Sequence, residues 1–244
     1  MKRRTFIKGT AAFGFGLAVF PQIAFQDTNA TIPYKELIGK GNPELFGEGY
    51  KLRKEAYHAF LVMSDEALKS DIKIKVASSY RSFDHQNRIW ERKYKSNINN
   101  GLNPKESINK IIEYSTIPGT SRHHWATDID LIDGNVPQPR HVLNPKHFNG
   151  TGCFSKFKDW MDVHANRFGF YLVYTNETNR KGFKYEPWHY SYKPLSQGYL
   201  QAYQKLDLRD LITSEQLIGC NHFSEEFITN YLNENIMDIN LELL

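Results

Sequence analysis

The sequence has little that would place it among membrane-spanning or fibrous proteins. Beyond residue 26, no stretch approaches the about 18 apolar residues that mark a membrane-spanning helix. There is no internal repeat and no low-complexity tract, and the 40% hydrophobic and 14% aromatic residues suffice for a core, which excludes a disordered or fibrous chain. Only two cysteines occur in 244 residues. Cys153 and Cys220 could pair in an oxidising compartment, and their spacing leaves that question open.

Acidic residues are absent before Asp27. In this segment four basic residues, among them Arg3 and Arg4, surround the start of an uncharged apolar stretch over 9–20. A basic start followed by a dozen apolar residues predicts a secretory signal, because a membrane span needs about 20. The letters RRTFIK also fit the twin-arginine export pattern. We therefore expect a signal peptide within residues 1–30, export to the periplasm or cell envelope, and no stable membrane span after processing. A retained N-terminal anchor is the alternative.

The excess positive charge lies in the same segment. The chain has 31 Lys+Arg and 27 Asp+Glu, a formal net charge of +4, and four of the basic residues precede Asp27. Removing those four leaves 27 basic against 27 acidic residues over 27–244. A balanced domain lacks the basic surface that nucleic-acid binding requires, so no nucleic-acid partner is expected.

Hydrophobic periodicity predicts an α+β core followed by helices. Helical spacing covers 46–70, a segment after a predicted N-cap at Asp84, a short stretch over 105–114, and 154–168. Alternating patterns predict strands over 72–79, 127–133, 170–175 and 188–193. Further helices are expected over 197–205, 208–218 and 223–233. The prediction is one domain over 31–193, with its core from about 45, and a helical C-terminal extension over 194–244.

Three segments combine residue types that carry chemistry: SSYRSFDHQ at 78–86, PGTSRHHWATDID at 118–130 and EPWHY at 186–190. His123, Asp130 and His189 offer two imidazoles and a carboxylate, a set that can hold a catalytic zinc and leave a position open for water. Glu186 offers a second carboxylate that can take a proton from that water. Spacing alone leaves open that these are ordinary core or salt-bridged residues.

The same segments resemble the signature of the zinc D-alanyl-D-alanine carboxypeptidase family, which includes the vancomycin-resistance D,D-peptidases. The family pattern is S-x-H-x-x-G-x-A-x-D, then E-x-W-H, preceded by Y-R-S…Q. The matching residues are Ser121, His123 and Asp130; Glu186, Trp188 and His189; and Tyr80, Arg81, Ser82 and Gln86. The resemblance covers about 45–193. It implies a Hedgehog/D,D-peptidase-like α+β fold, in which a small antiparallel sheet flanked by helices holds one catalytic Zn²⁺ ion.

The resemblance also implies a role for each matched residue. His123, Asp130 and His189 would bind the zinc ion, and Glu186 would be the catalytic base and proton shuttle. Arg81 would contact substrate or stabilise the developing oxyanion with its fixed fork of donors, unless it serves only as a salt bridge. The substrate-binding residues would be Tyr80, Gln86, Ser121 and Trp188.

Two positions depart from the family pattern. Ala126 stands where the family has glycine, and an alanine there would be strained if the site needs a positive φ. Asp128 stands where the family has alanine, on the same face of the predicted strand as Asp130. Asp128 would either orient a metal ligand or compete as one. His124 could likewise compete with His123, and the family spacing favours His123 and Asp130.

The function implied is metal-assisted amide hydrolysis by a zinc metallopeptidase. The substrate and partner would be a peptidoglycan stem peptide that ends in D-alanine, cut by a D,D-carboxypeptidase. The alternatives are an L,D-carboxypeptidase, an endopeptidase that cuts wall crosslinks, and a non-catalytic zinc or peptidoglycan-binding module. Glu186 favours a hydrolase, because a binding module needs no base. The oligomeric state stays open.

Overall fold

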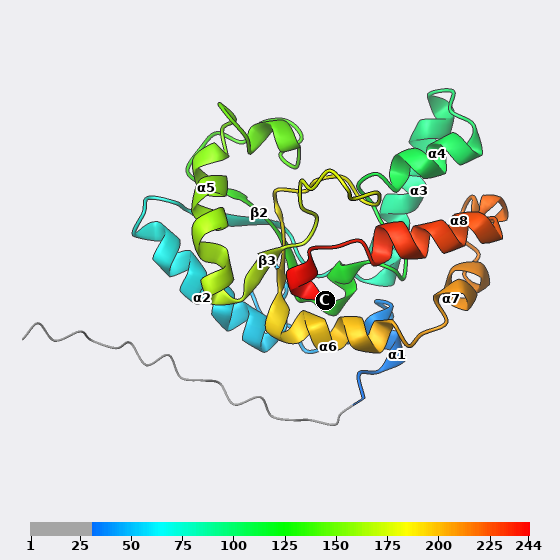
Figure 1. Ribbon diagram of the computed structural model, residues 1–244, viewed down its shortest axis with the longest axis horizontal. Coiled ribbons are helices and arrows are strands. Elements are labelled where there is room, and N and C mark those ends of the chain that lie inside the picture. Colours follow the sequence, from blue (N-terminus) through cyan, green and yellow to red (C-terminus); the bar gives the residue numbers. More distant parts are fainter. Residues whose placement is uncertain (1–30) are drawn as a thin grey trace, which may run out of the picture. The chain divides into compact units, whose positions relative to one another are not determined.

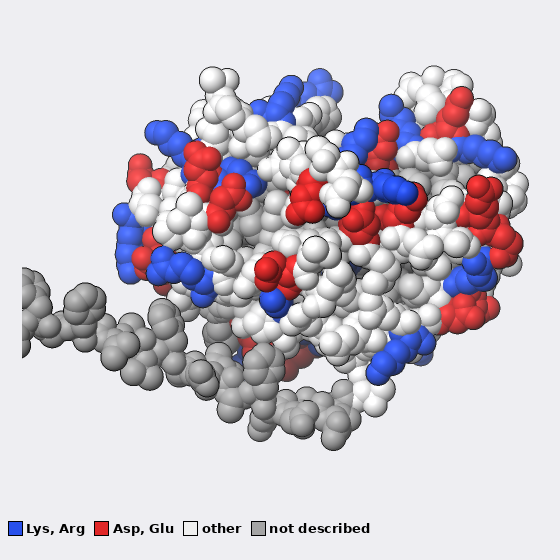
Figure 2. All heavy atoms as spheres, in the orientation of Figure 1, with Lys and Arg blue, Asp and Glu red and all other residues white. Residues whose placement is uncertain are grey.

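The computed structural model describes residues 31–244, which form one compact unit (Figure 1). The predicted signal peptide, residues 1–30, lies outside the described residues. No helix within 31–244 is both long and apolar enough to cross a membrane. Figure 2 shows Lys and Arg interspersed with Asp and Glu over the face in view, as expected for a part of the chain with nearly balanced charge.

A four-stranded antiparallel sheet lies at the centre, in the order β1-β2-β4-β3. The strands are β1 (Ile74–Ser78), β2 (Asp128–Asp133), β3 (Phe170–Leu172) and β4 (His189–Tyr192). All residues of the two central strands, β2 and β4, are buried. The register pairs Asp130 with His189 on one side and with Ser78 on the other. The sheet therefore brings together two predicted metal ligands that are far apart in the sequence.

One hydrophobic core lies between the sheet and two helices. Helix α2 (Lys54–Leu68) buries Ala56, Phe60, Met63 and Ala67 at spacings of three and four, and α5 (Ser155–His164) buries Phe157, Trp160 and Met161. Figure 1 shows both helices beside the sheet. The predicted helix over 46–70 begins too early, because residues 46–53 form an extended loop closed by a bridge between Phe46 and Leu52. This first core supports the metal-ligand strands from behind.

A second core joins the remaining helices. It contains residues of α1 (Tyr34–Leu37), α3 (Phe83–Asn99), α4 (Pro104–Ile111), α6 (Lys193–Tyr203), α7 (Leu208–Ser214), α8 (Glu225–Asn230) and the π-helical turn Tyr231–Ile236. In Figure 1, α3, α4, α7 and α8 lie together on the side of the sheet opposite α2 and α5. The C-terminal residues are helical, as predicted, and they share this core with α3 and α4. The α+β fold class with a helical C-terminal extension is confirmed.

Three local details differ from the prediction or answer a question it left open. Ser82, with an extended backbone, caps α3 by accepting a hydrogen bond from the amide of His85, so the predicted cap at Asp84 is wrong. Helix α6 starts at Lys193 and not at 197, because Pro194 is well accommodated in a first helical turn. Cys153 is exposed, Cys220 is half-buried, and both are free thiols.

Candidate metal centre and its cavity

Three predicted ligands converge at the front of the sheet. His123 lies in the 3₁₀ turn Arg122–Trp125 that leads into β2, Asp130 lies within β2, and His189 begins β4. One ligand atom of each lies within 4.8 Å of the others, and all three residues are buried. His123 Nε2 is 3.5 Å and His189 Nδ1 is 4.0 Å from Asp130 Oδ1. The structure thus assembles two imidazoles and one carboxylate around a common point.

Hydrogen bonds on the far side of each ring orient the two histidines. His123 Nδ1 is 2.8 Å from the Ser79 carbonyl oxygen, which can only accept, so this nitrogen donates. His189 Nε2 likewise donates to the Asp128 carboxylate at 2.9 Å. In each ring the other nitrogen points toward the common point, as metal-binding histidines require, and that of His189 also lies 2.9 Å from Glu186 Oε2. His123 Nε2 and Asp130 Oδ1 are buried without a hydrogen-bond partner, so the residues present fit a zinc ion there.

The Asp128 carboxylate orients His189 and has three further hydrogen-bond partners. It accepts hydrogen bonds from Arg122 Nε at 2.9 Å, Ser191 Oγ at 2.6 Å and Thr127 Oγ1 at 2.8 Å. Burial favours its neutral form, but the charges of Arg122 and His189 hold the pKa of Asp128 well below its usual range. The structure therefore places Asp128 behind a predicted ligand, where it orients the ring and does not compete for a metal.

The two histidines at the metal centre have opposite pKa shifts. Burial, reinforced by the charge of Arg81, lowers the pKa of His123 to about 4. Burial also acts to lower the pKa of His189, but its hydrogen bonds to Asp128 and Glu186 outweigh this and raise it to about 9. At neutral pH His123 is thus ready to coordinate, whereas a metal must displace a proton from His189.

His124 faces away from the metal ligands. Its Nδ1 donates to the Arg81 carbonyl oxygen at 2.6 Å, and its Nε2 accepts from the Gly119 amide at 3.1 Å. Both ring nitrogens are therefore used, and burial lowers the pKa of His124 to about 3, which keeps it neutral. A Cβ at Gly39 would lie 2.4 Å from His124 Nδ1, so a glycine there makes room for the ring. His124 therefore links the backbone at Arg81 to the backbone at Gly119 and does not compete with His123 as a metal ligand.

Ala126 adopts the left-handed conformation that the family glycine would favour. Its φ is 58°, and the residue caps the 3₁₀ turn that carries His123. An L-residue in this region costs about 1–2 kcal/mol relative to the right-handed conformation. The side chain is fully buried, and the Ala126 carbonyl accepts from the Arg53 amide at 2.9 Å. The strain expected for alanine at this position is present.

Glu186 lies beside the metal position. Its Oε2 is 2.9 Å from His189 Nδ1, and a tight turn closed by the His189 amide on the Glu186 carbonyl oxygen, at 3.0 Å, keeps the two residues together. The carboxylate is buried, and burial raises the pKa of Glu186. A buried carboxylate with a raised pKa next to a possible metal can both accept and return a proton.

Arg81 extends over the same centre. Its Nη2 is 3.7 Å from Asp130 Oδ2, its Nη1 donates to Gln86 Oε1 at 2.9 Å, and its Nε is buried without a partner. Gln86 is fully buried, and its amide group donates to the Thr116 carbonyl oxygen at 2.9 Å. Gln86 therefore holds Arg81 in position, and its predicted role in substrate binding stays a prediction that its burial does not support.

A cavity of about 610 Å³ opens onto these residues. Its walls include the predicted residues Arg81, Ser121, His123, Asp130, Glu186, Trp188 and His189. Tyr80 is half-buried and, like Gln86, does not line this cavity, so its predicted contact with substrate is not supported by its position. Sequence reasoning missed the wall formed by His85, Ile89 and Lys93, although their spacing of four on α3 marks one helical face.

The C-terminal extension, residues 194–244, holds one loop of the cavity wall. The Tyr231 hydroxyl accepts from the Ile117 amide at 3.0 Å and lies 2.7 Å from Thr120 Oγ1. The Tyr203 hydroxyl donates to the Gly119 carbonyl oxygen at 2.9 Å. These bonds hold residues 117–120, which lie between two cavity-lining residues, Thr116 and Ser121.

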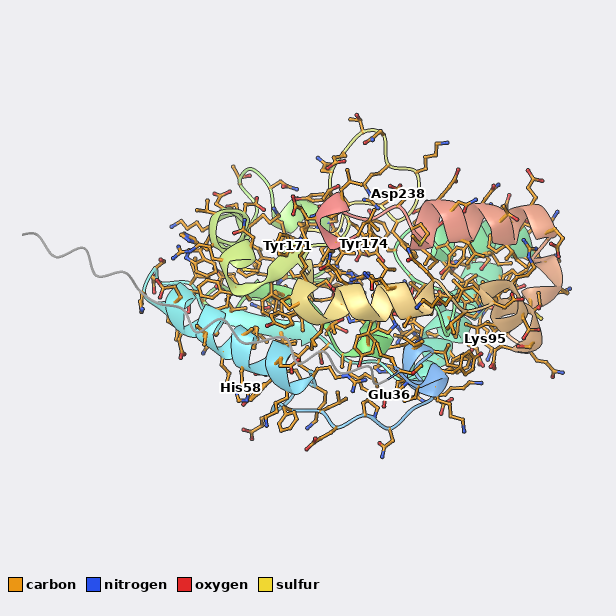
Figure 3. The ribbon with its side chains drawn as sticks, turned by 60° about the horizontal axis from the view of Figure 1, so that its bottom comes forward. Glu36, His58, Lys95, Tyr171, Tyr174 and Asp238 are labelled. Carbon is orange, nitrogen blue, oxygen red and sulfur yellow. The ribbon has the colours of Figure 1, made fainter. Side chains whose placement is uncertain are left out.

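The extension also holds the loop before Glu186. Asp238, labelled with Tyr174 in Figure 3, accepts from the Lys181 amide at 2.7 Å, and its carbonyl oxygen accepts from Arg180 Nη2 at 2.8 Å. The Arg180 guanidinium lies 5.4 Å from the centre of the Tyr174 ring, which lines the cavity. A Cβ at Gly182 would lie 1.6 Å from the Glu234 carbonyl oxygen, so glycine is required for this close approach.

Comparison with known proteins gives one family and several relatives. The family model described as "VanY: D-alanyl-D-alanine carboxypeptidase" matches residues 49–195, more than half of the chain. A D-alanyl-D-alanine carboxypeptidase of Enterococcus faecalis is 26% identical over 142 residues, which are 58% of this chain and 48% of that protein. The chain thus spans about half the length of this relative.

Two solved structures share the fold. VanYB in complex with D-alanine-D-alanine superposes with a TM-score of 0.52 at 23% identity, over 72% of this chain and 92% of the other. A glutamate-to-alanine variant of the vancomycin-resistance D,D-pentapeptidase VanY in complex with Zn(II) gives a TM-score of 0.50 at 23% identity, over 68% and 86% of the two chains. At this identity the likeness establishes the small antiparallel sheet and its helices, not the chemistry.

Proposed function

Because the chain belongs to the VanY family of D-alanyl-D-alanine carboxypeptidases, we propose that it removes the terminal D-alanine from peptidoglycan stem peptides by zinc-assisted hydrolysis. The observation that carries this proposal is the position of Glu186, a buried carboxylate 2.9 Å from a predicted metal ligand, inside a cavity large enough for a peptide end. The names of the relatives support it: one is a D-alanyl-D-alanine carboxypeptidase, and the solved structures hold D-alanine-D-alanine or Zn(II).

His123 Nε2, Asp130 Oδ1 and His189 Nδ1 would hold the metal. A bound zinc ion supplies Lewis acidity, which polarises a carbonyl oxygen and lowers the pKa of a bound water from about 15.7 to about 7. With His189 deprotonated, the two imidazoles and one carboxylate would leave a position open, as in catalytic zinc sites. Asp128 and the Ser79 carbonyl oxygen keep the rings turned toward the metal position.

Glu186 would move the proton. Its carboxylate takes a proton from water as the oxygen attacks the scissile carbonyl carbon. It then returns that proton to the nitrogen as the carbon–nitrogen bond breaks, so that D-alanine leaves as an amine. Burial raises the pKa of Glu186, which makes its carboxylate a better proton acceptor. Arg81, with a buried Nε that lacks a partner, would stabilise the negative charge that develops on the carbonyl oxygen.

A non-catalytic module would not require this arrangement. Zinc or peptide binding alone does not require a second buried carboxylate beside the metal position, whereas hydrolysis requires a base there. An exported enzyme would also meet peptidoglycan outside the cytoplasmic membrane, in line with the predicted signal within residues 1–30. Arg81 together with residues 121–189 would then form the working part of the site.

The test is incubation of zinc-loaded protein with three defined substrates, analysed by mass spectrometry. These are a stem pentapeptide ending in D-alanyl-D-alanine, a tetrapeptide with an L,D bond at its end, and a crosslinked dimer. We expect loss of one D-alanine from the pentapeptide. Glu186→Gln should abolish this loss while one zinc per chain remains bound, and Glu177→Gln, at an exposed acid outside the cavity, should leave it intact. Full activity of Glu186→Gln would refute the mechanism.

A further inference from the structure

One wall of the cavity carries a cation that the proposed mechanism does not use. His85, Ile89 and Lys93 project from successive turns of α3 into the cavity, and Lys93 is half-buried there. Among residues 31–244, Lys93 takes part in no ion pair, whereas Lys95 on the same helix pairs with Glu91 at 2.9 Å. Burial lowers the pKa of Lys93, and the charge of Glu186 offsets this only in part. Lys93 is thus a partly desolvated ammonium group without a partner.

The carboxylates that line the cavity already take part in the candidate metal centre. Asp130 and Glu186 are the acidic residues that line it, and both belong to the metal centre. Arg122 also lines the cavity, but its charge is balanced by Asp128. The positive charge of Lys93 therefore has no counter-charge of its own, and a buried cation without one costs free energy that an anionic ligand would recover.

Outside the candidate metal centre, two further side chains of the cavity offer hydrogen-bond donors without a partner. Arg122 Nη1 and Thr116 Oγ1 are buried and have no hydrogen-bond partner, and both residues line the cavity. Buried donors of this kind are normally satisfied, so a ligand that accepts hydrogen bonds fits them. Lys93 lies two turns beyond His85, about 12 Å along the helix axis. The face of α3 from His85 to Lys93 is therefore long enough to contact more than one residue of a bound peptide.

We propose that Lys93 is a specificity-determining residue that binds a carboxylate of the peptide substrate. This inference rests on the proposed peptidase function and adds the charge of the group that the site selects. The carboxylate has two possible sources in a stem peptide: its free C-terminus and an acidic residue within it. A terminal source would make the cavity selective for chain ends, as a carboxypeptidase requires. An internal source would make it selective for a particular stem.

The experiment measures peptide binding by calorimetry in zinc-loaded Glu186→Gln protein, so that hydrolysis does not consume the peptide. Three peptides are compared: the stem pentapeptide, its C-terminal amide, and the same peptide with its internal carboxylate converted to an amide. Lys93→Met should weaken binding of the pentapeptide about 10-fold or more, the usual effect of losing a charge-assisted hydrogen bond. Lys93→Arg should retain most of the affinity. Lys95→Met, at an exposed site labelled in Figure 3, should change nothing.

The modified peptides identify the source. One modified peptide should bind the Lys93→Met protein as tightly as it binds the protein with Lys93. That peptide lacks the carboxylate that Lys93 binds. The inference is overturned if Lys93→Met binds the pentapeptide as well as the parent does, or if it weakens all three peptides equally. Failure of the proposed function is a separate result: wild-type protein would then cut no peptide, whatever the calorimetry shows.

Discussion

Residues 123–189 contain the three candidate metal ligands and Glu186, whereas residues 194–244 contribute no side chain to the candidate metal centre and instead hold the loops around it. The candidate metal ligands lie on a 3₁₀ turn and on two buried central strands, where hydrogen bonds orient both histidine rings. The extension contacts the loops around the cavity largely through their backbone atoms, by way of Tyr203, Tyr231 and Asp238. Changes in the first region should therefore alter the metal, and changes in the second should alter the shape of the cavity.

The largest effect is expected from removing a ligand. His123→Ala and His189→Ala each take away one of three ligand atoms and should reduce bound zinc from one per chain to almost none, with loss of hydrolysis. His58→Ala, at an exposed residue labelled in Figure 3, is the matched control and should keep both. Metal content by atomic emission is the measurement. Full zinc occupancy in either variant would mean that the ligand assignment is wrong.

A smaller change in metal binding is expected from substituting Asp128, which lies behind the candidate ligand His189. Asp128→Asn keeps the size of the side chain but removes the charge that holds His189, so zinc should bind about 10–100-fold more weakly. A chelator competition measures this affinity. Ser191→Ala removes one hydrogen bond to Asp128 without removing a charge and should have a lesser effect. Unchanged affinity in Asp128→Asn would show that the orientation of His189 does not depend on this carboxylate.

The extension should act on the substrate and not on the metal. Tyr231→Phe removes the hydroxyl that binds Ile117 and Thr120 but keeps the ring, so zinc content should stay at one per chain. We expect KM to rise about 3-fold or more and the free energy of unfolding to fall by about 1 kcal/mol. Tyr34→Phe, at an exposed tyrosine, is the control. Loss of stability with unchanged KM would reduce the extension to a purely structural role.

The smallest effect is expected at the strained turn. Ala126→Gly restores the residue type that tolerates φ of 58° and should raise the free energy of unfolding by less than about 1 kcal/mol, because flexibility in the unfolded chain offsets part of the relief. Ala59→Gly, within helix α2, should lower it by about the same amount. Chemical denaturation measures both. A destabilised Ala126→Gly would mean that the buried methyl group matters more than the backbone strain.

Much of the candidate metal centre could be predicted from the sequence, because the strand patterns around Asp130 and His189 and the motif spacing point to the residues that the fold brings together. The remaining features depend on contacts between segments that are far apart in the sequence. Gln86 and Tyr80 match the family pattern, yet only the folded structure places Gln86 behind Arg81 and Tyr80 away from the cavity. The contact between Tyr231 and Ile117 joins residues 114 positions apart, and no local pattern marks it.

The most direct test of the central claim is anomalous diffraction at the zinc edge from crystals of the zinc-loaded protein. The arrangement predicts one strong peak about 2.0–2.2 Å from His123 Nε2, Asp130 Oδ1 and His189 Nδ1, with Glu186 beside it but not bound. A peak at any other group of residues, or none at this centre at full zinc loading, would contradict the account.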